Sequence, residues 1–189
     1  EITYGDLYRH ALEVAAVLQS LGLEPDETVA LMLPTSRDYF VAFCAVLLAG
    51  GIPVPIYPPV RRQQLEDHLK RQSRILDTCK AAILITNDEA IAAARLLTVS
   101  LDSLRHVFDL SNDLVTAASE ELNRTFEPAS RTPDDIAFLQ YTSGSTGDPK
   151  GVILTHANLL ANVRADGQAL GVDSNDVFVS WLPLYHDMG

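Results

Sequence analysis

Hydrophobic and polar positions near the start of the chain follow first the period of a helix and then that of a buried strand. Apolar residues between positions 7 and 21 recur about every 3.6 residues, which predicts an amphipathic helix that ends at Gly22. Thr3 and Asp6 have the spacing of a capping box at the start of this helix. The short apolar run 28–33 is typical of a strand buried inside a sheet.

Helical and extended patterns then alternate along the following part of the chain. Ser36 is predicted to cap a helix that runs to Ala49 and ends at Gly50. Prolines interrupt the apolar run 52–57, so we predict a short strand or an edge strand there, followed by a rigid loop. The remaining patterns predict a helix over residues 65–78 and a strand over 82–86. They then predict a helix that starts at residue 88 and a strand over 106–110.

Residues 111–134 show no clear period, and we expect them to form a surface loop with at most a helical turn. A strand over 136–141, a second strand and a helix near Ala157 follow, with Thr155 or His156 as the first cap of that helix. Strands that alternate with helices predict βαβ units. The sequence therefore predicts the α/β class, with mainly parallel sheets flanked by helices.

Composition narrows the classes of protein to which this chain can belong. Its 189 residues are 47% hydrophobic, which suffices for the core of one domain or a large piece of one. The net charge of −11 argues against a duplex nucleic acid as partner, because such a partner selects a basic surface. The longest apolar run, Tyr39–Ala49, is shorter than the roughly 20 residues that cross a bilayer, so we expect no transmembrane segment. Cys44 and Cys79 match neither a zinc site nor a disulfide framework, and we interpret them as small buried side chains in a reducing, cytoplasmic compartment.

The segment Tyr141–Gly151, with the sequence YTSGSTGDPKG, is unsuited to a packed core and well suited to an anion. Its glycines allow the backbone to approach a ligand, and successive N–H groups in such a segment form an anion-binding concavity. Its hydroxyl side chains add donors, and Lys150 adds a compact positive charge. The spacing of Gly147 and Lys150 differs from that of a Walker A motif, which disfavours a P-loop NTPase. From the residues alone two interpretations stay open: a polyphosphate site and an ordinary glycine–serine hairpin loop.

Three segments resemble, in matching order, signatures of the adenylate-forming (AMP-binding) superfamily. The sequence YTSGSTGDPKGV resembles its phosphate-binding signature, and LTHANL at 154–159 and WLPLYHDMG at 181–189 follow at matching spacing. The sequences LPLYHDMG and, at 53–59, PVPIYPP are most similar to the fatty acyl-AMP ligase and acyl-CoA synthetase branch. The resemblance covers residues 1–189 and implies a partial N-terminal AMP-binding domain, without the family's C-terminal domain.

The resemblance also implies a role for each group of candidate residues. ATP would be bound by the phosphate loop, whose candidate residues are Thr142, Ser143, Gly144, Ser145, Thr146, Gly147 and Lys150. Lys150 would contact the β- or γ-phosphate, and a loop hydroxyl, with Thr142 and Thr146 as candidates, would lie near Mg²⁺. His186 would lie beside the reacting acyl carboxylate and is, with Lys150, a catalytic candidate. Trp181 and Tyr185 would line the acyl channel with His186, although core packing accounts for these two aromatic residues equally well.

The function that the resemblance implies is ATP-dependent activation of a fatty acid to an acyl-adenylate, for transfer to the thiol of an acyl carrier protein. A CoA-forming acyl-CoA synthetase and an amino-acid adenylation domain share the first half-reaction and stay open as alternatives. A phosphate-binding module without catalysis is the alternative from a different class. Because the family has further motifs after the position of Gly189, we expect residues 1–189 alone to be inactive.

Overall fold

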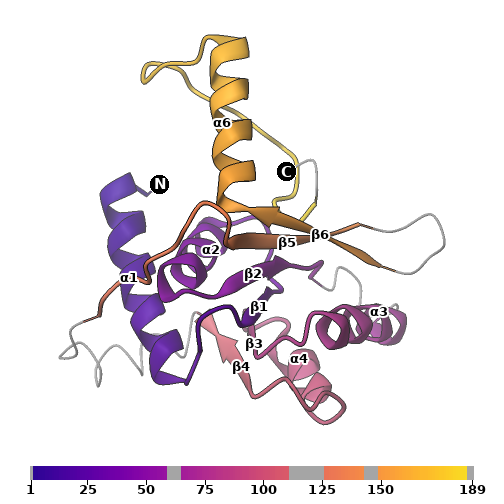
Figure 1. The fold of residues 1–189 in the computed structure, drawn as a ribbon. Helices are drawn as coiled ribbons and strands as arrows, with labels where there is room; N and C mark the ends of the chain where they lie inside the picture. The colour runs from indigo at the N-terminus through magenta and orange to yellow at the C-terminus, as the bar shows by residue number, and fades with distance from the viewer. Residues whose placement is uncertain (1, 59–64, 111–125, 143–148, 187–189) are drawn as a thin grey trace.

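The computed structural model describes residues 2–58, 65–110, 126–142 and 149–186, and within them the strands form two sheets of different kinds (Figure 1). One sheet is parallel and has the strand order β2-β1-β3-β4, and the other is the antiparallel pair β5-β6. The strands are β1 (Thr28–Leu31), β2 (Ile52–Pro55), β3 (Ile83–Thr86), β4 (His106–Asp109), β5 (Ile136–Thr142) and β6 (Lys150–Thr155). The helices are α1 (Tyr4–Ser20), α2 (Arg37–Ala49), α3 (Leu65–Thr78), α4 (Ile91–Leu97) and α6 (His156–Leu170).

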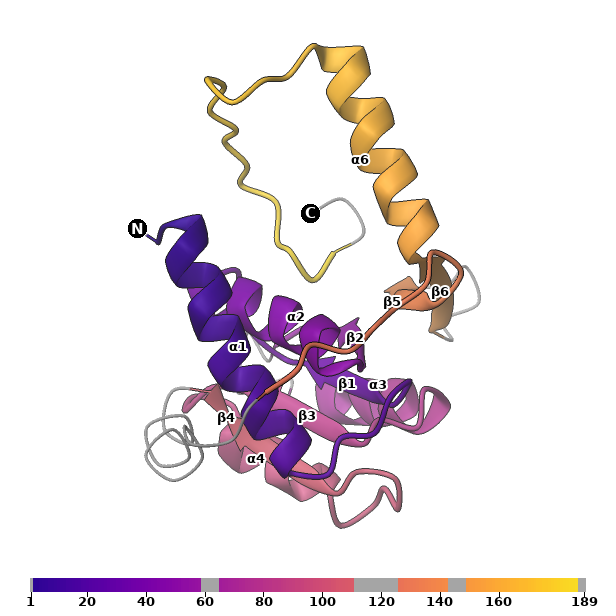
Figure 2. The same ribbon diagram turned by 60° about the vertical axis from the view of Figure 1, so that its left-hand side comes forward.

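Helices cover the parallel sheet on both faces, which explains why its strands are largely apolar. Val29 and Leu31 belong to a core shared with α1 and α2, whereas Ala30 and Met32, which alternate with them, belong to a core shared with α3 and α4. Figures 1 and 2 show α1 and α2 on one side of this sheet and α3 and α4 on the other. Successive side chains of a strand point to opposite faces, so one strand contributes to both cores. The predicted α/β class with a mainly parallel sheet is confirmed.

Local signals determine the ends of the first two helices as the sequence predicts. The Thr3 hydroxyl accepts a hydrogen bond from the amide of Asp6 (3.1 Å), and the Ser36 hydroxyl accepts one from the amide of Tyr39 (3.3 Å). Each cap satisfies an otherwise unpaired donor and stabilises its helix by about 1 kcal/mol. α2 ends where Gly50 takes the left-handed conformation, with a φ of 88°.

The middle elements agree with the prediction in type and order, and some of their boundaries differ by one to three residues. α4 begins at Ile91 rather than at Asp88, because the side-chain oxygen of Asn87 first closes a turn by accepting a hydrogen bond from the amide of Ala90 (3.3 Å). The predicted helix over 65–78 is confirmed as α3, and β2 has the predicted edge position in its sheet. Most of the expected surface loop, residues 111–125, lies outside the described residues.

The antiparallel pairing of β5 with β6 was not part of the predicted strand arrangement, although a hairpin loop had stayed open as an interpretation of residues 141–151. The two strands are antiparallel, with Tyr141 opposite Gly151 and Thr142 opposite Lys150. A short connection joins antiparallel neighbours, since a parallel pair needs a crossover of a dozen or more residues. Gly151 suits its position, because an added Cβ would lie only 3.0 Å from the ring of Tyr141.

α6 extends away from the parallel sheet at the end of β6 (Figure 1). Thr155 caps it through reciprocal hydrogen bonds with Asn158, and His156 is its first residue, so the predicted start is confirmed. No residue of α6 is buried, and Phe178 and Trp181 in the segment that follows are 90% and 91% exposed. Figure 2 shows this segment running from the far end of α6 back toward α2. Among the described helices, none has both the length and the apolar character needed to cross a membrane.

Candidate functional site

A cavity of about 450 Å³ lies between α2, the end of β2, the β5-β6 pair and the last described residues of the chain. Its lining is mainly apolar and includes the aromatic side chains Tyr39, Phe40, Phe43 and Phe138. Its polar lining consists of Gln140, Thr142 and His186. The structure therefore brings together two candidates, Thr142 and His186, that the sequence placed in separate segments.

Thr142 and Lys150 are the two phosphate-loop candidates that the structure describes. They lie opposite each other in the β5-β6 register, and residues paired in this way have Cβ atoms about 5 Å apart on one face of the sheet. Thr142 is half-buried and lines the cavity, whereas Lys150 is exposed to solvent. The other candidates lie outside the described residues; they are Ser143, Gly144, Ser145, Thr146 and Gly147.

Hydrogen bonds hold the segment that carries His186 against the start of α2. The amide of His186 closes a turn by donating to the carbonyl of Pro183 (3.0 Å). The Leu184 amide donates to the Thr35 hydroxyl (3.0 Å), and the Tyr39 hydroxyl donates to the Leu184 carbonyl (2.9 Å). Burial raises the pKa of the Tyr39 phenol, which keeps the phenol protonated and able to donate. The backbone on both sides of Leu184 is thus bonded to residues next to or within α2.

Aromatic rings and one side-chain amide hold the same segment from other directions. Tyr57, which follows β2, has its ring centroid 5.0 Å from that of Tyr185 and 6.2 Å from that of the His186 imidazole, and the second pair is T-shaped. The side-chain amide of Gln140, in β5, donates to the Tyr185 carbonyl (3.4 Å). Tyr57 was noted only as part of the PVPIYPP similarity, and its contact with His186 was not predicted. Neither periodicity nor spacing could reveal this contact, because the two residues are far apart in the sequence.

The two aromatic channel candidates have different environments. Tyr185 is half-buried and packs against the core shared with α1 and α2. Trp181 is 91% exposed, and the cavity lining does not include it. Core packing within the described part of the chain therefore accounts for Tyr185 but not for Trp181. A role for either residue in an acyl channel stays a prediction.

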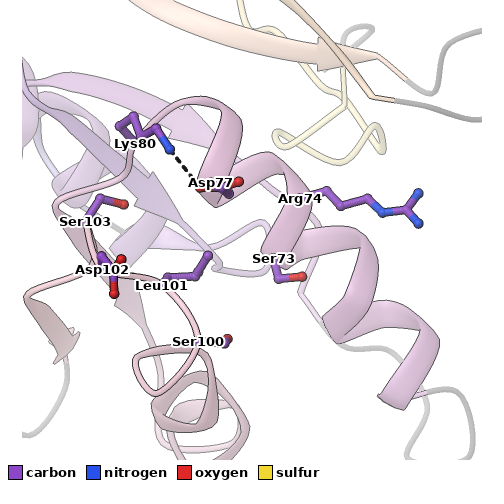
Figure 3. A pocket seen from close by; sticks show the side chains of 8 residues that line it. All are labelled: Ser73, Arg74, Asp77, Lys80, Ser100, Leu101, Asp102 and Ser103. Atoms are coloured by element: carbon purple, nitrogen blue, oxygen red, sulfur yellow. Dashed lines mark hydrogen bonds and ion pairs between the residues drawn. The ribbon is translucent and has the colours of Figure 1, made fainter.

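A second cavity, of about 630 Å³, lies between α3 and the loop that precedes β4 (Figure 3). Lys80 in its lining forms an ion pair with Asp77, with 2.8 Å between Nζ and Oδ1. Figure 3 shows the side chain of Arg74 directed away from the other lining residues. The cations Lys80 and Arg74 are matched in the lining by the carboxylates of Asp77 and Asp102. This cavity thus has no excess of positive charge with which to bind a phosphate.

Metal ligands among the described residues are limited. These residues contain no group of three or more His, Cys, Asp or Glu side chains that could hold a metal ion. The Thr142 hydroxyl is an oxygen of the kind that Mg²⁺ accepts, and Thr146, the other candidate, lies outside the described residues. Since Mg²⁺ bound with a nucleotide takes most of its ligands from phosphates and water, this small donor set fits such an ion.

Both cysteines are free thiols and half-buried, so the expectation of buried side chains holds only in part. Burial raises the pKa of the Cys79 thiol to about 11 and also raises the pKa of Cys44. Both groups therefore stay protonated at neutral pH, and neither acts as a thiolate nucleophile.

A comparison with models of known protein families gives a match over the whole chain. The model of the family described as "AMP-binding enzyme" matches residues 1–189. The chain belongs to the AMP-binding enzyme family. The resemblance inferred from three sequence segments is thereby confirmed.

Relatives of this family member include fatty-acid ligases. The medium-chain-fatty-acid–[acyl-carrier-protein] ligase TtuA of Teredinibacter turnerae is 33% identical over 100% of this chain and 34% of its own length. The long-chain-fatty-acid–AMP ligase FadD32 of Mycolicibacterium smegmatis is 36% identical over 100% of this chain and 29% of its own length. A solved structure from a study of fatty acyl-adenylate ligases from E. coli and L. pneumophila is 35% identical and has a TM-score of 0.89, covering 100% of this chain and 33% of that one. The chain thus spans about a third of the length of these relatives.

Proposed function

We propose that the protein takes part in the ATP-dependent activation of a fatty acid to an acyl-adenylate, for transfer to an acyl carrier protein. The observation that carries the proposal is that Thr142, at the start of the phosphate loop, and His186 line one mainly apolar cavity. Such a cavity suits a substrate with a hydrocarbon chain whose carboxylate has to reach a phosphorus atom. One relative is named as an acyl-carrier-protein ligase, which supports a carrier protein as the proposed acceptor. Another is named as an AMP ligase, which supports an acyl-adenylate as the proposed product of the first step.

In the proposed reaction, a carboxylate oxygen of the fatty acid attacks the α-phosphorus of ATP. A bond forms between that oxygen and the phosphorus, the bond from the phosphorus to the bridging oxygen breaks, and pyrophosphate leaves with the electron pair. Reactions of this kind are accelerated mainly by positioning the reactants and by neutralising phosphate charge. The protein therefore has to supply a phosphate cradle with a cation, and a group that orients the carboxylate.

The described residues can take these parts. Lys150 neutralises the charge of the β- or γ-phosphate, and its position opposite Thr142 lets its flexible side chain reach a nucleotide at the start of the loop. Mg²⁺, when bound with ATP, adds positive charge to the phosphates, and Thr142 is its described candidate ligand. His186 donates a hydrogen bond that orients the acyl carboxylate, inside a mainly apolar cavity that strengthens such contacts. Tyr185 and Trp181 are the residues that we propose to guide the acyl chain toward His186, which is the one of the three that lines the described cavity.

Exchange of pyrophosphate into ATP by the full-length protein tests the first half-reaction. We expect exchange that requires both a fatty acid and Mg²⁺, with the reaction lacking fatty acid as the control. A protein that binds ATP but shows no exchange with any fatty acid would support a phosphate-binding module without catalysis. Exchange with amino acids in place of fatty acids would support an amino-acid adenylation domain.

The acceptor thiol is tested separately, because CoA-forming relatives share the first half-reaction. We expect labelled fatty acid to be transferred to the phosphopantetheine thiol of a carrier protein and not to free CoA. Transfer to CoA would instead identify an acyl-CoA synthetase. ATP, a carrier thiol and the free thiols of Cys44 and Cys79 all fit a cytoplasmic location, which we include in the proposal.

A further inference from the structure

The ring of Tyr57 links the segment of His186 to α3. Its centroid lies 6.2 Å from that of the His186 imidazole, at an interplanar angle of 84°, and 5.0 Å from that of the Tyr185 ring. The guanidinium carbon of Arg71, in α3, lies 5.9 Å from the same Tyr57 centroid. Two distant parts of the chain therefore meet on one ring.

The backbone around Tyr57 is held by both neighbouring elements. The Ile56 amide donates to the carbonyl of Leu31 (3.0 Å), which extends the β1-β2 ladder to the residue before Tyr57. Burial lowers the pKa of His68, in α3, and a hydrogen bond with the backbone of Tyr57 opposes this shift. A tyrosine held in this way moves its ring mainly through two side-chain torsion angles, and contacts on the ring restrict these. The Tyr57 ring is thus a fixed surface rather than a free side chain.

The ring contact with Tyr57 differs from the hydrogen bonds of this segment because it acts on a side chain. The hydrogen bonds at Pro183, Leu184 and Tyr185 place the main chain of the segment. These bonds place the backbone, whereas the T-shaped pair with Tyr57 acts on the imidazole itself. T-shaped packing is a preferred geometry for two aromatic rings, so it favours the observed plane of the imidazole.

We propose that Tyr57 is a positioning residue, whose ring fixes the orientation of the His186 imidazole in the cavity while Arg71 steadies the ring from α3. The inference rests on the proposed function, in which His186 orients the acyl carboxylate. Catalytic groups have to be held close to the productive geometry, and small displacements lower the rate strongly. Loss of the Tyr57 ring should therefore slow the chemical step without weakening the binding of ATP.

Kinetics of Tyr57 variants of the full-length protein provide the first test. Tyr57→Leu removes the ring, and we expect kcat for adenylation to fall about 2- to 13-fold, the change that corresponds to the loss of one aromatic pair. The KM for ATP should not change. Tyr57→Phe keeps the ring and should recover most of the lost rate. Tyr8→Leu, which changes a 55% exposed tyrosine on α1, is the matched control and should behave as the unmodified protein.

A double-variant cycle tests whether Tyr57 acts through His186. In a His186→Ala background, Tyr57→Leu should cause no further loss of kcat, because the residue it positions is gone. Equal fold-losses from Tyr57→Leu in both backgrounds would overturn the inference, as would an unchanged kcat in Tyr57→Leu alone. A raised KM for ATP at unchanged kcat would place Tyr57 in the nucleotide site and would overturn it too.

A spectroscopic measurement tests the positioning role of Tyr57 even if the full-length protein forms no acyl-adenylate. A failure of this inference can therefore be distinguished from a failure of the proposed function. In NMR spectra of histidine-labelled protein, the imidazole protons of His186 are assigned by their loss in His186→Ala. We expect the ring current of Tyr57 to displace these resonances, the displacement to disappear in Tyr57→Leu, and Tyr57→Phe to retain it. Identical His186 resonances in the unmodified protein, Tyr57→Leu and Tyr57→Phe would show that the ring does not hold the imidazole.

Discussion

The helix that anchors the His186 segment ends at Gly50, and we expect Gly50→Ala to lower the free energy of unfolding by about 2–5 kcal/mol. Gly50 has a φ of 88°, a left-handed conformation that costs a residue with a Cβ about 1–2 kcal/mol. The added Cβ would also lie 2.8 Å from the Cβ of Ala129 and 3.3 Å from Nη2 of Arg131. Ala129 cannot retreat freely, because its amide donates to the Leu48 carbonyl at 2.9 Å. Overpacking of this kind adds about 1–3 kcal/mol to the conformational penalty.

Gly22→Ala separates the two penalties experimentally. Gly22 has a φ of 79°, but nothing lies within 4 Å of a Cβ added there, so only the conformational cost of about 1–2 kcal/mol is expected. Urea unfolding of both variants, in chains of the same length, gives the difference between their free energies of unfolding. The comparison requires that the free energy of unfolding falls with urea concentration at the same slope in both variants. Equal losses for Gly50→Ala and Gly22→Ala would refute the reasoning, because they would show that packing against Ala129 contributes nothing.

Three further predictions concern charge and catalysis. Lys150→Ala should slow adenylation by about 10- to 150-fold, because one charge-assisted contact is lost. Pyrophosphate exchange measures this rate. An unchanged rate in a folded variant would show that Lys150 does not contact the phosphates. His186→Ala should slow single-turnover adenylation by about 10-fold or more at unchanged nucleotide affinity, whereas a loss of affinity alone would assign His186 to the nucleotide. The Arg105 guanidinium donates hydrogen bonds to both carboxylate oxygens of Glu27 (2.8 and 2.7 Å) and lowers the pKa of that carboxyl group. The pair therefore stabilises the fold at pH values above the ordinary glutamate pKa. This stabilisation is lost as the pH falls through the lowered pKa. Arg105→Gln should therefore weaken the loss of stability on acidification, measured by urea unfolding between about pH 3 and pH 7, and an unchanged pH dependence would contradict this account.

Features with strong local signals could be predicted from the sequence. The caps at Thr3 and Ser36 and the end of α2 at Gly50 depend on residues within one turn of each other, so their chemistry is visible in the sequence. The alternation of helical and apolar strand patterns gave the α/β class for the same reason. The phosphate-loop segment after Thr142 also stood out, because a run of glycines and hydroxyls is unsuited to a core.

The arrangement of the candidate site could not be predicted, because its contacts join residues that are distant in the sequence. Tyr39 donates to the backbone of Leu184, and the Tyr57 ring packs on His186; no period or motif spacing encodes either pair. The antiparallel pairing of β5 and β6 is a different case, since their short separation excludes a parallel crossover and was a signal available in the sequence. The exposure of Trp181 depends on which surfaces pack against it, which the pattern of a single segment does not determine.

The position of the cavity relative to the parallel sheet explains why residues without a common motif meet there. Thr35 comes after β1 and Tyr57 after β2, and the two strands are parallel neighbours. The carboxyl ends of parallel strands lie at one edge of the sheet, where open α/β sheets commonly bind ligands. From this edge the Thr35 hydroxyl accepts a hydrogen bond from Leu184, and the Tyr57 ring packs on His186. A side chain placed just after a strand of this sheet can therefore orient the candidate catalytic histidine without being near it in the sequence. Tyr57 has that position because the β1-β2 ladder continues to Ile56.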